Sequence, residues 1–255
     1  MQLHFRESGH GRPIVILHGL FGSLDNWLGV APKLASNFRV FLLDLRNHGQ
    51  SPHADAMSYP LMAGDVAEFL DAHQLASAVI MGHSLGGKVA MQFALTFPAR
   101  TETLIVADMA PRVYKPSHAK LIAALLALNL SQFQTRHEIE EALAEEIPSL
   151  AVRRFLLKSL GRDAAGGFTW KMNLQGIAKN YPVLGEAIFS TRPFTKPTLF
   201  IRGGKSDFIR AEDEPMIREL FPVTQIETIP GAAHWVHADK PDEFAESVLK
   251  FLHLS

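Results

Sequence analysis

Ser84 is the residue of this chain best placed to do covalent chemistry. It is the central residue of Gly82-His83-Ser84-Leu85-Gly86, between a short β-branched apolar run and a segment of helix-forming composition. A serine at the tip of such a strand-to-helix turn has its hydroxyl lifted into the open. Only small flanking residues allow the turn, because a side chain at either glycine would collide with the neighbouring chain. The motif therefore predicts a serine nucleophile.

A serine nucleophile needs a base, since its hydroxyl is almost wholly protonated at neutral pH. His234 lies in Gly231-Ala232-Ala233-His234-Trp235, directly after an apolar run late in the chain. That position suits the imidazole that accepts the serine proton and then protonates the leaving alcohol or thiol. His237, three residues further on, lacks this position and is interpreted as structural.

The third requirement is a set of hydrogen-bond donors for the negative charge that develops on the substrate carbonyl oxygen. His18-Gly19-Leu20-Phe21-Gly22-Ser23 follows an apolar run, and its glycines leave backbone N–H groups unpaired and allow close approach. We expect the N–H groups of Leu20 and of Leu85, at the start of the helix, to form the oxyanion hole. The chemistry requires no metal ion and no organic cofactor, and none is predicted.

The surrounding elements must bring these residues together. Apolar runs over residues 13–17, 39–43, 78–81 and 103–107 alternate with segments of helical spacing, and the alternation resumes with runs at 198–201 and 225–229. Helices are expected at residues 25–34, 61–70, 85–97, 212–220 and 242–252. This pattern predicts an α/β fold with a mostly parallel central sheet covered by helices on both faces. Ligands of such sheets bind beyond the carboxyl ends of the strands, where the residues described above are expected to lie.

The pattern changes between residues 111 and 194. Amphipathic helical segments at 119–130, 137–146 and 151–160 follow one another without a convincing strand, and residues 161–167 form a joint rich in helix breakers. We interpret residues 111–194 as a helical cap inserted into a core of residues 1–110 and 195–255. Some apolar cap residues, together with Phe21, Trp170 and Trp235, are expected to line an acyl pocket.

Composition limits the partners. The 255 residues include 25 Lys and Arg against 26 Asp and Glu, which favours neither a nucleic acid nor an anionic membrane as a partner. The chain has no cysteine, which excludes disulfides, thiolate metal sites and a cysteine nucleophile. No leader pattern and no membrane-length apolar run is visible. We therefore expect a cytoplasmic protein without stable membrane association, acting on a small molecule.

These motifs resemble a known family. His18-Gly19, Asp44-Leu45-Arg46-Asn47-His48-Gly49, Gly82-His83-Ser84-Leu85-Gly86 and Gly231-Ala232-Ala233-His234 are similar to the α/β-hydrolase superfamily over essentially the whole chain. The stretches at 18–23, 106–111 and 234–241 resemble, more narrowly, small bacterial carboxylesterases that act on short acyl esters and acyl-CoA thioesters. The resemblance implies an α/β-hydrolase fold. It also implies a serine hydrolase that cleaves short- to medium-chain carboxylic esters or acyl thioesters through an acyl-enzyme intermediate.

The resemblance leaves two candidates for the acid that orients His234. Superfamily members usually carry it in a Gly-x-x-Asp turn after the strand that here ends at Ile201. Counting from Gly204 places Asp207 at that position, whereas counting from Gly203 places Ser206 there.

We favour the register counted from Gly203, because it aligns Phe208 and Ile209 with the apolar pair of the usual turn. The resemblance to the narrower esterase group then implies that Asp108, at the end of the preceding strand, is the acid. Ser206 is an additional hydrogen-bond partner in this interpretation, and Asp207 is the alternative acid.

Other activities use the same framework. A serine at the turn argues against epoxide hydrolases and haloalkane dehalogenases, which need a carboxylate nucleophile. Carbon–carbon bond hydrolases and cofactor-free haloperoxidases keep the same triad, so fold and triad do not separate them from esterases. A ligand-binding receptor that retains hydrolase residues is a further alternative, distinguished by its lack of turnover.

Overall fold

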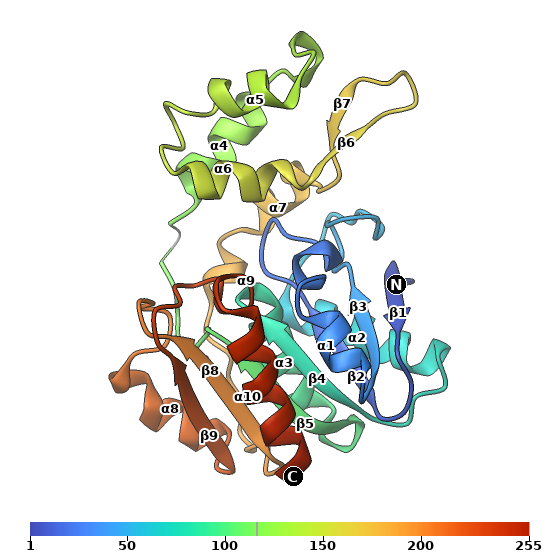
Figure 1. The fold of residues 1–255 in the computed structure, drawn as a ribbon, viewed down its shortest axis with the longest axis vertical. Helices are drawn as coiled ribbons and strands as arrows, with labels where there is room; N and C mark the ends of the chain where they lie inside the picture. The colour runs from blue at the N-terminus through green and yellow to red at the C-terminus, as the bar shows by residue number, and fades with distance from the viewer. Residues whose placement is uncertain (116, 255) are drawn as a thin grey trace.

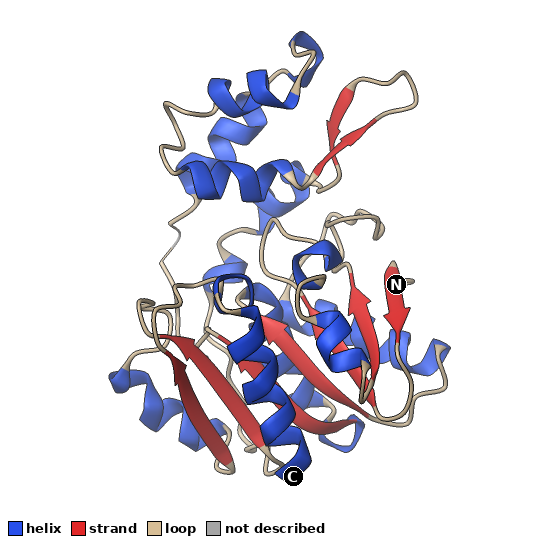
Figure 2. Cartoon of the chain, in the orientation of Figure 1, coloured by secondary structure: helices blue, strands red, loops and turns tan. Residues whose placement is uncertain are grey.

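The protein is built around a central sheet of seven strands. The computed structural model describes residues 1–115 and 117–254. The strands are β1 (Phe5–Ser8), β2 (Pro13–Leu17), β3 (Arg39–Leu43), β4 (Ala78–His83), β5 (Thr101–Ala107), β8 (Thr198–Gly203) and β9 (Thr224–Ile229). Their order across the sheet is β1-β3-β2-β4-β5-β8-β9, and β1 runs antiparallel to β3 while the other pairs are parallel. The predicted mostly parallel sheet is confirmed (Figure 2).

Alternate residues of the inner strands enter two separate hydrophobic cores, one on each face of the sheet. Val15 and Leu17 of β2 pack with helices α2 (Tyr59–Ala72) and α3 (Leu85–Thr96), whereas Ile14 and Ile16 pack with α1 (Ala31–Ala35) and α10 (Pro241–Leu254). These four residues are fully buried. Burial on both faces explains why the strands are continuously apolar. The remaining core helices are α8 (Glu214–Leu220) and the single turn α9 (Val236–Asp239).

One expected helix is divided. Instead of a continuous helix over residues 25–34, the chain forms a 3₁₀ turn, η1 (Leu24–Trp27), and then the short helix α1. Pro32 lies in the first turn of α1, where its missing N–H leaves no helical hydrogen bond unmade.

The segment between β5 and β8 stands above the edge where the strands β4 and β8 end (Figure 1). It contains α4 (Ala119–Ala127), α5 (Arg136–Ala142), α6 (Leu150–Leu157) and α7 (Leu174–Asn180), and an antiparallel hairpin of β6 (Leu160–Arg162) and β7 (Phe168–Trp170). We call residues 111–194 the cap.

The hairpin corrects the prediction of a cap without strands. Asp163 accepts hydrogen bonds from the N–H groups of Ala165 at 2.9 Å and Gly167 at 2.8 Å, and Gly166 has a φ of 83°. The helix breakers of this stretch therefore form a tight turn. Strands of three residues are too short to show an alternating pattern in the sequence.

Two linkers join the cap to the core, and they lie side by side. The Tyr114 N–H donates to the Gly185 carbonyl and the Ile188 N–H to the Pro111 carbonyl, both at 2.8 Å. Lys88 of α3 is 1% exposed, and its ammonium donates to the carbonyls of Arg112 and Glu186, one in each linker. The helix that follows Ser84 is thus tied to both linkers. Within the described residues no helix is long and apolar enough to span a membrane.

Candidate active site

Ser84 occupies the turn between β4 and α3 in a backbone conformation that non-glycine residues rarely adopt, with φ 53° and ψ −116°. A Cβ atom added to Gly82 would lie 2.0 Å from the Gly86 carbonyl oxygen, and one added to Gly86 would lie 2.5 Å from the carbonyl oxygen of His18. The prediction that both positions need glycine is confirmed. The turn holds Ser84 at the carboxyl edge of the sheet.

A chain of hydrogen-bonding atoms runs from Ser84 to a buried carboxylate. His234 Nε2 lies 3.0 Å from Ser84 Oγ, and His234 Nδ1 lies 2.8 Å from Asp108 Oδ2. Asp108 is fully buried at the end of β5 and has a φ of 50°. Its other oxygen accepts from the Gly203 N–H at 3.0 Å, and the Ser206 hydroxyl donates to Oδ2. The carboxylate is therefore fixed in position by three partners, two from the end of β8 and the turn after it and one from the segment after β9.

Asp207 lies outside this arrangement. Its side chain is exposed, and its backbone carbonyl accepts hydrogen bonds from the guanidinium groups of Arg112 at 3.1 Å and Arg210 at 3.2 Å. The structure thus brings Ser84, His234, Asp108 and Ser206 together and leaves Asp207 at the surface. This is the register counted from Gly203.

The loop after β2 approaches Ser84 closely. Leu20 and Leu85 line the same cavity as Ser84, and a Cβ atom added to Gly19 would lie 3.3 Å from Ser84 Cβ. Within the part of the chain that the structure describes, the N–H groups of Leu20 and Leu85 donate no hydrogen bond to the protein. Both groups are available to an incoming oxygen.

His18 orients the peptide group that carries the Leu20 N–H. Its Nε2 accepts from the Leu45 N–H at 3.0 Å, so the neutral ring carries its proton on Nδ1, which donates to the Gly19 carbonyl at 2.8 Å. Burial lowers the pKa of His18 to about 4, which keeps the ring neutral. The carbonyl and N–H of a trans peptide point in opposite directions, so the Leu20 N–H faces away from His18.

Known proteins share this architecture. The family model of the alpha/beta hydrolase fold matches residues 12–241. This chain belongs to the α/β-hydrolase fold family. It is 38% identical to the sn-1-specific diacylglycerol lipase ABHD11 of Xenopus tropicalis over 253 residues, covering 96% of this chain and 79% of the relative. It is 35% identical to esterase YbfF of Escherichia coli, covering 94% and 93% of the two chains.

A solved structure is also similar to this α/β hydrolase. A marine microorganism esterase is 44% identical and superposes with a TM-score of 0.95, covering 98% of this chain and 99% of the other. The resemblance seen in the sequence motifs is therefore confirmed at the level of the family and of the fold.

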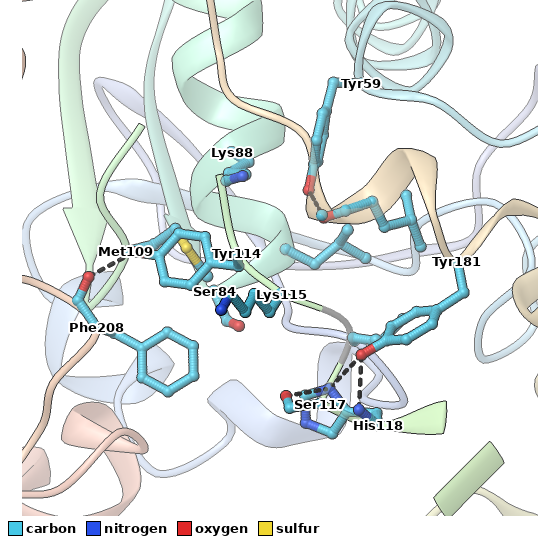
Figure 3. Close-up of a pocket in the computed structure, with 14 residues that line it drawn as sticks. Tyr59, Ser84, Lys88, Met109, Tyr114, Lys115, Ser117, His118, Tyr181 and Phe208 are labelled. Atoms are coloured by element: carbon cyan, nitrogen blue, oxygen red, sulfur yellow. Dashed lines mark hydrogen bonds between the residues drawn. The ribbon is translucent and has the colours of Figure 1, made fainter. Parts of the chain in front are cut away.

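Ser84 of this α/β hydrolase opens onto a cavity of about 100 Å³ between the core and the cap (Figure 3). Most of its lining is apolar or aromatic, with contributions from Leu20, Tyr59, Leu85, Lys88, Met109, Tyr114, His118, Tyr181, Leu184 and Phe208. Burial lowers the pKa of Lys88 to about 7 and also lowers that of His118. The cavity is small and combines an apolar wall with a few polar groups.

The three aromatic residues expected to line the pocket do not line this cavity. Phe21 is 3% exposed and its side chain belongs to the hydrophobic core, while the Trp235 ring packs against Phe155 with centroids 5.0 Å apart. Trp170 belongs to the hairpin strand β7 and packs against the same core. The aromatic content of the sequence did not show which rings would be consumed by packing.

Two other aromatic residues lie near Ser84 and His234. The Phe208 ring stacks on the His234 imidazole with centroids 3.6 Å apart. The Tyr114 hydroxyl accepts from the Ala110 N–H at 2.9 Å and donates to the Phe208 carbonyl. The signal for Phe208 was present in the sequence, since it directly follows the turn that holds Ser206. Tyr114 had no such signal.

His83 is a further residue that sequence reasoning passed over. Its Nε2 lies 2.8 Å from the carbonyl oxygen of His234, and because a carbonyl only accepts, His83 is the donor. Burial and the neighbouring His237 keep the pKa of His83 well below its usual value. The residue before Ser84 therefore anchors the backbone of His234. His237 stacks on Trp27, with centroids 4.1 Å apart.

Proposed function

We propose that this protein is a serine carboxylesterase in which Ser84, His234 and Asp108 form the catalytic triad. The observation that carries the proposal is the continuous chain of contacts from Ser84 Oγ through the imidazole to Asp108 Oδ2, at 3.0 Å and 2.8 Å. Relatives named as esterases and lipases that span nearly the whole chain support the same activity.

In the first half of the reaction, Ser84 Oγ attacks the ester carbonyl carbon while His234 Nε2 takes the hydroxyl proton. Asp108 accepts the Nδ1–H, which orients the ring and stabilises the imidazolium that forms. The carbonyl oxygen gains the electron pair of the C=O bond and accepts hydrogen bonds from the Leu20 and Leu85 N–H groups. Each donor of this kind is worth about 2.7–4 kcal/mol in the transition state.

The intermediate collapses when the C–O bond to the leaving group breaks and His234 Nε2 protonates the departing oxygen. The acyl group is now an ester of Ser84. Water then loses a proton to His234 and attacks this ester, and the same steps in reverse order release the carboxylic acid and restore the Ser84 hydroxyl. An acyl thioester would follow the same path with a thiol as leaving group.

The cavity supports short to medium acyl chains as substrates. Its volume of about 100 Å³ leaves little room for a long chain, and the paired linkers and Lys88 close the side nearest α3. We therefore propose that butyrate and hexanoate esters are turned over faster than long-chain glycerides.

The test is a series of p-nitrophenyl esters and matching acyl-CoA thioesters, from two to twelve acyl carbons, with the Ser84→Ala variant as control. The expected result is turnover that declines beyond medium chains and a loss of at least about 10³-fold in Ser84→Ala. Retention of more than a few per cent of activity in that variant, or absence of turnover with every ester, would exclude the proposal. Faster hydrolysis of long-chain diacylglycerol would refute the chain-length part alone.

A further inference from the structure

Consecutive peptide groups of the loop after β2 are each held by a different partner. His18 and the Gly22 N–H fix the Gly19 carbonyl, as seen from contacts of 2.8 Å and 3.0 Å. The Phe21 N–H donates to His48 Nε2 at 3.2 Å, and the Phe21 carbonyl accepts from the Ser159 hydroxyl at 2.8 Å. The last of these partners comes from the cap.

The loop needs this support, because Phe21 has a φ of 63°. A residue with a bulky side chain is strained in the left-handed region by roughly 1–3 kcal/mol, and it stays there only when its surroundings hold it. Phe21 directly follows Leu20, whose N–H is the proposed oxyanion donor. Gly22 directly follows Phe21, and its N–H holds the carbonyl of the Gly19–Leu20 peptide group that carries this donor. A relaxation at Phe21 therefore moves Gly22 and loosens one of the two contacts that orient the Leu20 N–H.

His48 is held in a single tautomer and accepts a hydrogen bond from one side of Phe21. Its Nδ1 lies 3.0 Å from the Arg46 carbonyl, which can only accept, so Nδ1 carries the proton and Nε2 is free to accept from the Phe21 N–H. The ring is fully buried. His48 therefore bonds within its own turn and also reaches the loop after β2.

Ser159 holds the other side from a fixed place in the cap. It lies between α6 and β6 and is 3% exposed. Its N–H donates to the Leu156 carbonyl at 2.9 Å, and its own carbonyl accepts from the Lys171 N–H at 2.8 Å. The hydroxyl thus extends from a rigid junction of the cap to a core residue far away in the sequence.

We propose that Ser159 and His48 are positioning residues of the reaction, which clamp Phe21 from its two sides and so keep the Leu20 N–H aimed at the developing oxyanion. The cap then does more than roof the substrate, because its hairpin junction completes the oxyanion loop of the core. This inference rests on the proposed esterase function.

The role makes a distinctive kinetic prediction. An oxyanion exists only in the transition state and the tetrahedral intermediate, so a misaligned donor lowers kcat and leaves ground-state binding unchanged. Loss of a whole donor costs about 10²–10³-fold in kcat, and a displaced donor retains part of that effect. We expect Ser159→Ala to lower kcat about tenfold with KM for p-nitrophenyl butyrate within twofold of the wild type.

The matched control is Ser149→Ala. Ser149 is also a cap serine, and its hydroxyl accepts from the Val152 N–H at 3.4 Å at the start of α6, without contact to the loop after β2. Ser149→Ala should lower the melting temperature slightly and leave kcat unchanged. His48→Leu, which removes the acceptor of the Phe21 N–H, should reproduce the kcat loss of Ser159→Ala. Ser159→Thr, which keeps the hydroxyl, should retain most of the wild-type kcat.

A second readout is the affinity for a butyl boronic acid, which binds Ser84 as a tetrahedral anion, compared with that for butyrate, which does not. In Ser159→Ala the boronic acid affinity should fall by the same factor as kcat, while butyrate affinity stays constant. If the alanine variant fails to fold, Ser159→Cys, similar in size but a weak donor, gives the same comparison.

Two results would overturn the inference. One is an unchanged kcat in a folded Ser159→Ala or Ser159→Cys variant. The other is a rise in KM in Ser159→Ala, or a loss of kcat in Ser149→Ala equal to that in Ser159→Ala. Either finding would mean that Ser159 only holds the cap against the core. Failure of the proposed function itself would be seen separately, as absence of ester turnover in the wild-type protein.

Discussion

Asp108→Asn should disable the enzyme while preserving its shape, because the substitution reverses the hydrogen bonds around His234. In the wild-type protein the Asp108 carboxylate accepts hydrogen bonds from the Gly203 N–H, from the Ser206 hydroxyl and from His234 Nδ1. Asparagine has one amide oxygen. If that oxygen keeps the Gly203 N–H, the amide NH₂ faces Ser206 and the imidazole, and it donates to both.

A ring that accepts at Nδ1 carries its proton on Nε2, which lies 3.0 Å from Ser84 Oγ. It cannot then take the serine proton. Restoring the productive tautomer forces two N–H groups against each other in a buried site, and we expect a fall in kcat of about 10³–10⁴-fold, the size seen when a triad acid is amidated. That fall corresponds to about 4–5.5 kcal/mol in the activation free energy.

The assay is steady-state hydrolysis of p-nitrophenyl butyrate, with thermal melting as the check on folding and the rate of Ser84 labelling by a serine-directed phosphonate as a second readout. Asp207→Asn is the matched control, because its side chain is exposed and does not contact His234. Its kcat should stay within about twofold of the wild type. A folded Asp108→Asn variant that keeps a tenth of wild-type kcat, or a crippled Asp207→Asn variant, would refute the assignment of the acid.

Three further predictions concern Ser206, the buried histidines His18 and His48, and Lys88. Ser206→Ala removes one donor to Asp108 and should lower kcat about tenfold, in line with one hydrogen bond of roughly 0.5–1.5 kcal/mol; no change would show that this contact is idle. Burial lowers the pKa of His18 to about 4 and that of His48 to about 3, whereas the unfolded value is about 6.5. Between these values the unfolded state binds more protons than the folded state. The free energy of unfolding should therefore fall as the pH drops from 6.5 to about 4. In urea titrations His48→Gln should flatten this slope by about one proton, and an unchanged slope would contradict the buried neutral ring. Burial lowers the pKa of Lys88 to about 7, whereas the unfolded value is about 10.5. The contribution of Lys88 to the free energy of unfolding should therefore rise between pH 7 and 10, by up to about 1.4 kcal/mol per pH unit. Lys88→Met should abolish that rise.

The sequence was informative wherever a local constraint dictated residue type. Strands buried on both faces must be apolar throughout, and the turn at Ser84 admits only glycine on either side, so the sheet and the turn that holds Ser84 were predictable. His234 was predictable because strand ends of a parallel sheet meet at one edge. Phe208 and Ile209 indicated the register of the turn after β8 and with it Ser206, and the resemblance to small esterases then implied Asp108 as the acid.

What escaped prediction depends on contacts between distant segments. Trp170 and Tyr114 both pack against the hydrophobic core, and nothing local indicates that only Tyr114 also lines the cavity. The hairpin in the cap was missed because three-residue strands carry no periodic signal. Ser159 could not be predicted either. A serine after a helix has no local sign of its role, because only tertiary folding brings the Phe21 carbonyl to its hydroxyl.

The paired linkers have a consequence for how such a protein can diversify. The chain leaves the core at Pro111 and returns at Ile188, and a hydrogen bond of 2.8 Å joins these two residues. The cap is therefore an inserted segment whose two ends are hydrogen-bonded to each other. Insertions, deletions or the replacement of the whole segment need not shift β5 or β8, and so need not disturb Asp108 or the Gly203 N–H. Natural variation or laboratory recombination can remodel the roof of the cavity at this junction, provided that the new roof supplies a donor to the Phe21 carbonyl.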